Sequence, residues 1–300
     1  MKIAITTPTG HVGSTITDFL LEFGGDIEVL LLGRRPDRLK EFVRRGAQTA
    51  IGSQDDADFL VKATRGVDAL FWATPPGYGS DDVRAFQNRL GRAAAMAIRT
   101  NRIPRVVNLS SIGAHLGEGV GPINGLHDVE GLLNGAAVHI THLRPGFFFE
   151  NLLWQVDSIR KWGRISLPLS GDRRYPMLAT RDIGRVAAAR LASRGWVGHF
   201  VGELHGPADL SFDEAAGILA DVLGRKVEFV KSDLAETRQA LLESAMSENA
   251  VELFLEMYEA IEMGRLRPIE LRSSRTTTPT TLTEFARETI MPMLAEPVTS

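Results

Sequence analysis

Short apolar runs alternate with helical patterns over the first half of the sequence. The runs at residues 2–6, 28–32, 48–51, 69–73, 105–109 and 139–144 predict buried strands. Between them lie segments with helical spacing, of which residues 81–100 are the clearest, because apolar side chains recur there at steps of three and four. Strands that alternate with helices of this length predict an α/β fold with a doubly wound parallel sheet.

The pattern changes after residue 150, where helices predominate. Helices are predicted at residues 154–162, 180–194 and 211–223, and one or two more at 232–263, with small strands at 199–201 and 227–230. Ser211 with Glu214, and Thr281 with Glu284, have the spacing of capping boxes. We expect a sheet domain over residues 1–150 and a smaller, mostly helical domain over 151–300, from which some segments return to the first. A polar tail closes the chain at 296–300.

Composition narrows the classes of function. Lys and Arg number 34 against 37 Asp and Glu, so the net charge of -3 offers no positive excess for nucleic acid. The absence of cysteine excludes disulfides and thiolate nucleophiles. Among the seven histidines only His139 and His142 have a zinc-like spacing, and on a strand they would point to opposite faces, so no metal site is predicted. No apolar run suits a signal peptide or a membrane span, and a cytoplasmic location without membrane association is expected.

The first predicted turn has the composition of a phosphate-binding loop. The segment TPTGHVGS at residues 7–14 follows the first strand and begins a helix. A phosphate-binding loop needs glycine where the backbone approaches the anion and where the helix packs closely on the strand, and Gly10 and Gly13 can serve these two roles. Two glycines alone are a weak motif, but this position strengthens it. The candidate cofactor contacts are Thr7, Thr9, Gly10, His11, Val12 and Gly13.

The end of the second strand indicates which dinucleotide is bound. Arg34 and Arg35 stand where an acid would bind a ribose 2′-hydroxyl, and arginine there accommodates a 2′-phosphate. A solvated loop is the alternative reading of the pair. With the upstream glycines in place, the arginines favour NADP over NAD.

Other strands end in small or polar residues at the same predicted edge of the sheet. Ligands of open α/β sheets bind outside the carboxyl ends of the strands, so these ends are expected to line the rest of the cleft. The candidates are Asp55 on the adenine side, Thr74, Pro75, Ser110, Ser111, Arg144 and Pro145.

Six segments together carry a resemblance to a known family. They are ITTPTGHVG at 5–13, LLGRR at 31–35, RVVNLSSIG at 105–113, HDVEGLL at 127–133, THLRPGFFFENL at 141–152 and MLATRDIGRVAA at 177–188. The sequence resembles the NmrA-like atypical short-chain dehydrogenase/reductases over almost its whole length. This resemblance implies a Rossmann domain that binds NADP(H) and a smaller domain that closes over a substrate cleft. Members include quinone and azo-dye reductases and redox-sensing regulators.

The sequence departs from the family pattern at two places. Thr7 and Pro8 stand where the family's GATGxxG loop has Gly-Ala, so the tight first turn must rest on other residues. Typical members also carry a tyrosine and a lysine four residues apart, whereas the corresponding stretch at 126–131 contains neither. A tyrosine mechanism is therefore excluded at that stretch.

Few other groups can move a proton in the predicted cleft. His127 is the candidate proton donor, because an unperturbed histidine titrates near pH 6.5, although a histidine at the start of a helix is equally often structural. Ser110 and Ser111 can hydrogen-bond a carbonyl, or serve only as turn residues. Glu130, three residues after His127, either orients that histidine or caps and solubilises the helix.

Aromatic residues after the sixth strand suggest a wall for a planar substrate. The candidate substrate contacts are Phe147, Phe148, Phe149 and Trp154, and the resemblance adds Asn151. Such aromatics are more often plain core. Asp182 is expected to fasten the two domains together or to cap a helix.

We therefore expect an NADP(H)-dependent oxidoreductase that reduces a small planar acceptor such as a quinone or an azo compound. A non-catalytic NADP(H) sensor is the alternative, with a protein partner on the acidic stretch 232–263, which carries eight acids and one base. A nucleotide-sugar epimerase or dehydratase requires the missing tyrosine. The sequence leaves the substrate and the oligomeric state, including a homodimer, open.

Overall fold

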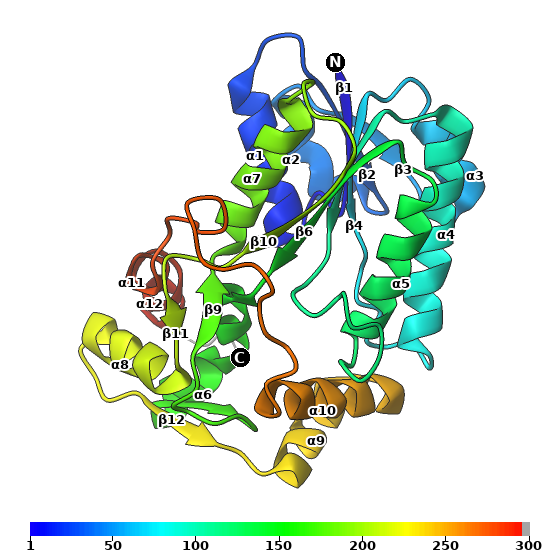
Figure 1. The fold of residues 1–300 in the computed structure, drawn as a ribbon. Helices are drawn as coiled ribbons and strands as arrows, with labels where there is room; N and C mark the ends of the chain where they lie inside the picture. The colour runs from blue at the N-terminus through cyan, green and yellow to red at the C-terminus, as the bar shows by residue number, and fades with distance from the viewer. Residues whose placement is uncertain (296–300) are drawn as a thin grey trace.

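A seven-stranded parallel sheet forms the centre of the molecule in the computed structural model, which describes residues 1–295 (Figure 1). Its strands are β1 (Lys2–Thr6), β2 (Glu28–Gly33), β3 (Gln48–Ile51), β4 (Ala69–Ala73), β5 (Arg105–Leu109), β6 (His139–Pro145) and β10 (His199–Leu204). The order across the sheet is β10-β6-β5-β4-β1-β2-β3, so the winding direction reverses between β1 and β4. The six strands predicted in the first half and the doubly wound α/β fold are confirmed. The polar tail at 296–300 lies outside the described residues.

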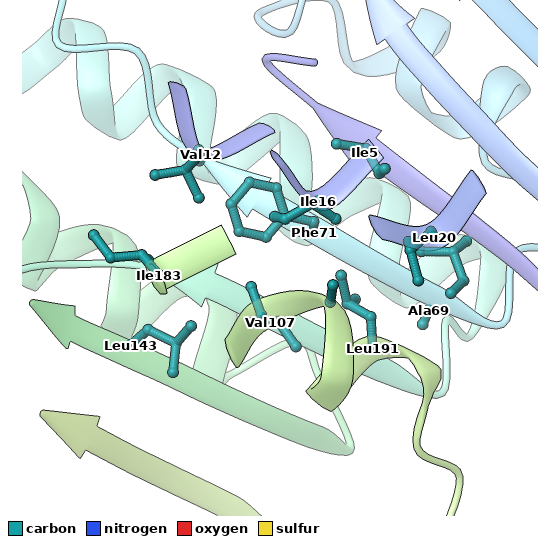
Figure 2. Packing of buried hydrophobic residues seen from close by; sticks show 14 of the residues in the cluster. Ile5, Val12, Ile16, Leu20, Ala69, Phe71, Val107, Leu143, Ile183 and Leu191 are labelled. Carbon is teal, nitrogen blue, oxygen red and sulfur yellow. The ribbon is translucent and has the colours of Figure 1, made fainter. Parts of the chain in front are cut away.

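Helices cover both faces of this sheet because its strands are apolar on both sides. One face packs against α1 (His11–Phe23) and α7 (Thr180–Ala192), and the other against α3 (Ala57–Ala63), α4 (Val83–Asn101) and α5 (Ile123–Asn134). Figure 2 shows the first interface, where Ile16 of α1 and Ile183 of α7 lie beside Phe71 and Val107 of the strands. After β2 the chain forms a short turn of helix, Pro36–Leu39, and α2 (Lys40–Arg44).

Two segments beyond residue 150 belong to this large unit. The strand predicted at 199–201 is confirmed and extends further, to Leu204; as β10 it joins the central sheet, where His199 pairs with Ile140 and Leu204 with Pro145. Helix α7 packs closely on α1: a Cβ at Gly184 would lie 2.6 Å from the Cβ of Thr15. Hydrophobic spacing alone cannot reveal such pairing, because the partners are some sixty to 170 residues apart in the sequence.

The rest of the second half forms a smaller part below the sheet in the view of Figure 1. It contains a three-stranded sheet of β7 (Phe147–Phe148), β9 (Tyr175–Leu178) and β11 (Asp209–Leu210), and the pair β8 (Arg164–Leu167) and β12 (Glu228–Lys231). Its helical segments are Phe149–Gln155, α6 (Val156–Trp162), α8 (Phe212–Leu223), α9 (Leu234–Glu243), α10 (Glu248–Glu262), α11 (Leu282–Phe285), Ala286–Ile290 and α12 (Met291–Ala295). The stretch 232–263 is thus two helices.

The predicted capping boxes and the predicted role of Asp182 are confirmed. Both capping boxes are formed, Ser211 with Glu214 at α8 and Thr281 with Glu284 at α11. Asp182 of α7 accepts hydrogen bonds of 2.8 Å from the backbone N and Oγ1 of Thr280, and so ties the large unit to the segment before α11. Among residues 1–295, no helix has the length and apolar composition needed to cross a membrane.

Candidate functional site

The loop after β1 leaves the first turn of α1 free to bind an anion. Thr7 adopts a left-handed backbone with φ of 48°, a conformation usually reserved for glycine, and its carbonyl accepts a 3.0 Å hydrogen bond from the Gly10 N–H. Gly10 is the N-cap residue and supplies no capping side chain. The first backbone N–H groups of this 13-residue helix therefore remain available, and with the helix dipole they favour a negatively charged ligand.

Gly13 lets α1 approach the loop closely. A Cβ at this position would lie 2.2 Å from the carbonyl oxygen of Thr7, a distance that no real side chain tolerates. The glycine-to-backbone contact that a phosphate loop requires is thus present, although Thr7 and Pro8 stand in place of Gly-Ala. Thr7 itself makes the tight turn.

The two arginines predicted to recognise the 2′-phosphate lie beside this loop. Arg34 and Arg35 follow β2, the neighbour of β1, and both are exposed. A Cβ on the adjacent Gly33 would lie 3.8 Å from the Pro8 side chain, which places the two loops side by side. Neither arginine forms an ion pair within the part of the chain that the structure describes.

The candidates at the next strand ends lie along the same edge of the sheet. The Asp55 carboxylate is 3.8 Å from the Arg89 guanidinium, across the loop after β3. The Thr74 hydroxyl, just past β4, accepts a 3.0 Å hydrogen bond from the Trp72 indole. These side chains therefore flank the crevice that begins where the strand order reverses, the usual ligand position in doubly wound sheets.

A cavity of about 410 Å³ lies between the strand ends and the smaller part. The predicted residues on its wall are Thr74, Ser110, Ser111, Pro145, Phe147, Phe148, Asn151 and Trp154. Sequence reasoning missed a further set, which includes Tyr78, Gln87, Tyr175, Phe212, Phe254, Met257 and Tyr258. All three tyrosines of the protein thus line the same cavity.

Some of these unpredicted cavity residues had a recognisable signal in the sequence, and others had none. Tyr78 follows the turn at Pro75 in the loop after β4, at the edge where ligands bind. Phe254 and Tyr258 are spaced by one helical turn on α10, which indicated a buried face but not what it covers. Tyr175 stands alone on a short strand, and no local pattern identifies it.

Burial determines the ionisation of the tyrosines. It raises the pKa of Tyr78, Tyr175 and Tyr258 to about 12 in each case. The three hydroxyl groups therefore stay protonated at neutral pH. They can donate hydrogen bonds to a ligand but do not act as bases.

Arg144 and Glu130 form a buried ion pair behind the cavity wall. The guanidinium donates to both carboxylate oxygens, at 2.9 Å from Nε and 2.5 Å from Nη2, and the side chains are only 9% and 7% exposed. Burial alone would raise the pKa of Glu130, but the hydrogen bonds and charge of Arg144 outweigh it and hold that pKa below its usual value. Glu130 therefore does not orient His127, and its partner Arg144 does not line the cavity.

Two other predicted residues lie away from the cavity wall. The Nδ1 of His127 lies 2.7 Å from the carbonyl oxygen of Ala114 and donates to it, which fixes the ring against the neighbouring loop. Phe149 is fully buried and packs on Phe285, with ring centroids 5.6 Å apart. Trp154, in contrast, lies at the rim and is 62% exposed.

Comparison with known proteins agrees with this architecture. The NmrA-like family model matches residues 1–286. The chain belongs to the NmrA-like family. An NAD(P)H azoreductase from Xenophilus azovorans is 29% identical over 256 residues, which cover 85% of this chain and 86% of that protein. A (4-alkanoyl-5-oxo-2,5-dihydrofuran-3-yl)methyl phosphate reductase from Streptomyces griseus is 31% identical over 242 residues, 80% of each chain.

Solved structures of two reductases have the same fold as this NmrA-like chain. An Escherichia coli NADPH-dependent quinone oxidoreductase, in complex with NADPH, superposes with a TM-score of 0.81 at 20% identity and covers 95% of this chain and 99% of its own. The triphenylmethane reductase of Citrobacter sp. gives a TM-score of 0.79 at 20% identity, with coverage of 98% and 100%. At this level of identity the likeness concerns the fold.

Proposed function

We propose that this NmrA-like protein is an NADP(H)-dependent oxidoreductase that reduces a small, largely planar acceptor such as a quinone or an azo compound. The observation that carries the proposal is the position of the cavity. Its aromatic wall begins at the carboxyl ends of β4, β5 and β6, and β4 pairs with β1, the strand that leads into the uncapped N-terminus of α1. The related proteins named as azoreductase and quinone oxidoreductase support this function.

The residues at the sheet edge fit a dinucleotide. In our assignment, the backbone of the loop from Thr9 to Gly13 binds the pyrophosphate, and Arg34 and Arg35 bind the 2′-phosphate. Asp55 lies on the adenine side, and Thr74 and Pro75 pass beneath the cofactor. The bound cofactor supplies a hydride, so the chain needs to position the acceptor and exclude water.

The cavity residues perform the positioning. Ser110, Ser111 and Asn151 offer neutral hydrogen-bonding groups, and Phe147 and Phe148 offer flat apolar surface. For a quinone, one hydride and one proton complete the hydroquinone, and we assign delivery of the proton from bulk solvent to the Ser110 and Ser111 hydroxyl groups after hydride transfer. We assign His127 a structural role, because its ring is held by Ala114 and does not line the cavity.

The sensor alternative depends on the acidic helices α9 and α10. The structure uses several of their side chains internally: Glu262 accepts hydrogen bonds from Ser170 and Lys231, and Arg238 pairs with Glu252. The apolar face of α10 also lines the cavity through Phe254 and Tyr258. We therefore assign α10 to the acceptor site, and place the protein in the cytoplasm with a small-molecule substrate.

Binding and turnover measured in one sample test the proposal. Calorimetry with NADPH and with NADH comes first, followed by absorbance at the nicotinamide band while quinones and azo dyes are added. We expect tighter binding of NADPH and oxidation that depends on the acceptor. NADPH binding without oxidation by any acceptor would instead identify a sensor, and absence of binding would refute both functions.

Gly13→Ala is expected to abolish detectable NADPH binding and to lower the melting temperature. The new Cβ would force the Thr7 carbonyl and the start of α1 apart, which moves the backbone N–H groups away from the pyrophosphate. Calorimetry and thermal unfolding measure the two effects. Gly217→Ala in α8 is the matched control, because a Cβ there meets no atom within 4 Å and alanine favours a helix. Normal NADPH binding by Gly13→Ala would contradict the assigned loop.

A further inference from the structure

The wall of the cavity carries no charged side chain. Within residues 1–295, every side chain that lines it is apolar, aromatic, or a neutral hydroxyl or amide. The buried charges of Arg144 and Glu130 pair with each other, and neither residue lines the cavity. Arg173, which acts on the pKa of Tyr175, donates hydrogen bonds to the carbonyl oxygens of Ile261 and Glu262 and does not line the cavity. A charged ligand group placed here would lose its hydration without gaining a counter-ion, which is strongly unfavourable.

Two groups of contacting aromatic rings line the cavity. Phe147, Tyr175 and Phe212 form one group, and Tyr78, Phe254 and Tyr258 form the other. Edge contacts hold both groups: the centroids of Phe147 and Phe212 are 5.4 Å apart, and those of Tyr78 and Phe254 are 4.9 Å apart. Rings held in this way offer rigid flat surfaces to an aromatic ligand.

Three polar atoms of residues that line the cavity have no protein partner. Within the described part of the chain, the Tyr175 hydroxyl, Oε1 of Gln87 and Oγ of Ser110 form no hydrogen bond, and each atom is shielded from solvent. Space for the Gln87 amide is kept by Gly125, where a Cβ would lie 1.8 Å from Oε1. Buried polar groups without partners are rare in proteins, and the carbonyl oxygen of a ligand would accept a hydrogen bond from the Tyr175 hydroxyl.

We propose that the cavity selects uncharged aromatic carbonyl compounds over anionic ones, and that the Tyr175 hydroxyl donates a hydrogen bond to the ligand carbonyl. This assignment of the acceptor rests on the proposed function. It narrows the substrates to neutral quinones and similar compounds and excludes sulfonated dyes. The protonated state of Tyr175 at neutral pH provides the required donor.

Binding without turnover tests the selectivity separately from the reductase activity. Without added dinucleotide, whose oxidised nicotinamide ring would bring a positive charge to the cavity, calorimetry compares 1,4-naphthoquinone with its 2-sulfonate, and the lack of cysteine prevents thiol addition to either compound. We expect the neutral quinone to bind at least a hundredfold more tightly. Similar affinities, or no binding of the neutral quinone, would overturn the proposal. Selective binding combined with absence of NADPH oxidation would preserve it while removing the reductase function.

Tyr175→Phe tests the hydrogen bond. The variant is expected to bind 1,4-naphthoquinone about tenfold more weakly and to bind naphthalene, which has no carbonyl, as the wild type does. Its melting temperature should not fall, because the hydroxyl has no protein partner to lose. An equal loss for both ligands would show that only ring packing matters, and an unchanged affinity for the quinone would exclude Tyr175 as the donor.

A positive charge added at the rim of the cavity tests whether the cavity's lack of charge causes the selection against anionic ligands. Trp154 lines the cavity and is 62% exposed, whereas Trp162 is 68% exposed and does not line it. Trp154→Arg is expected to raise the affinity for the sulfonate about tenfold, and Trp162→Arg, the matched control, to leave it unchanged. An equal gain in both variants would attribute the effect to net charge and not to the cavity.

Discussion

Replacing Arg34 and Arg35 with alanine is expected to weaken NADPH binding about a hundredfold and to leave NADH binding within about twofold. Hydrogen bonds to a charged group contribute about 1.5–3 kcal/mol each, and a hundredfold change corresponds to about 2.7 kcal/mol. The 2′-phosphate distinguishes the two cofactors, and the arginines are free of ion pairs within the described residues. Calorimetry with both dinucleotides measures the selectivity.

The control for this experiment is another exposed arginine on the same side of the sheet. Arg44 of α2 is 73% exposed and pairs with Glu41, so Arg44→Ala removes the same charge without touching the loop after β2. Its NADPH affinity should stay close to the wild-type value. An equal loss for NADPH and NADH in the Arg34 and Arg35 variant would refute recognition of the 2′-phosphate.

Glu130→Ala is expected to lower the free energy of unfolding by about 3–5 kcal/mol. The substitution leaves the Arg144 guanidinium buried without its carboxylate, and the cost of an uncompensated buried charge is of this size. Because the pKa of Glu130 is lowered from 4.5 in the fold, the pair stabilises the protein above that pH. The contribution disappears as the pH falls through the lowered pKa. Urea unfolding measured at several pH values reports both effects.

Two variants separate the buried charge from lost packing. Asp128→Ala removes the carboxylate that binds the more exposed Arg84, and it should cost about 1 kcal/mol or less. Replacing Glu130 and Arg144 together with leucine and methionine should recover most of the stability, since no buried charge remains. If this double replacement were as unstable as Glu130→Ala, packing would be the cause.

The central sheet was predictable because its strands are buried on both faces. Such strands are continuous apolar runs, as in residues 69–73, which are buried throughout. The strand–loop–helix turn to which we assign phosphate binding was predictable as a turn, because Gly10 and Gly13 occupy fixed positions between strand and helix. β10 was not assigned to this sheet, since pairing between His199 and Ile140 depends on tertiary packing that no local pattern records.

The cavity could be predicted only in part for the same reason. Residues directly after strands, such as Ser110 and Phe147, were found because parallel strands end at one edge. The tyrosines were not predicted as cavity residues, because the smaller part brings Tyr175 and Tyr258 to that edge of the sheet from distant segments. The sequence placed Glu130 correctly near His127 on the same helix. It could not show that Arg144, on another element, is the partner of Glu130. A buried arginine binds a carboxylate more strongly than a histidine does, because it donates two parallel hydrogen bonds.

The late position of α7 and β10 in the chain affects how the protein is made. While the ribosome has released only the first 150 residues, the apolar side of α1 that α7 later covers has no partner. At about 5–20 residues per second, reaching residue 204 takes roughly another 3–11 seconds. During that interval the side of α1 at Thr15, which later packs on Gly184, and the edge of β6, which later pairs with β10, remain open. The half of the molecule translated first is thus completed only by segments translated after it, and chaperone demand is expected to be greatest in that interval.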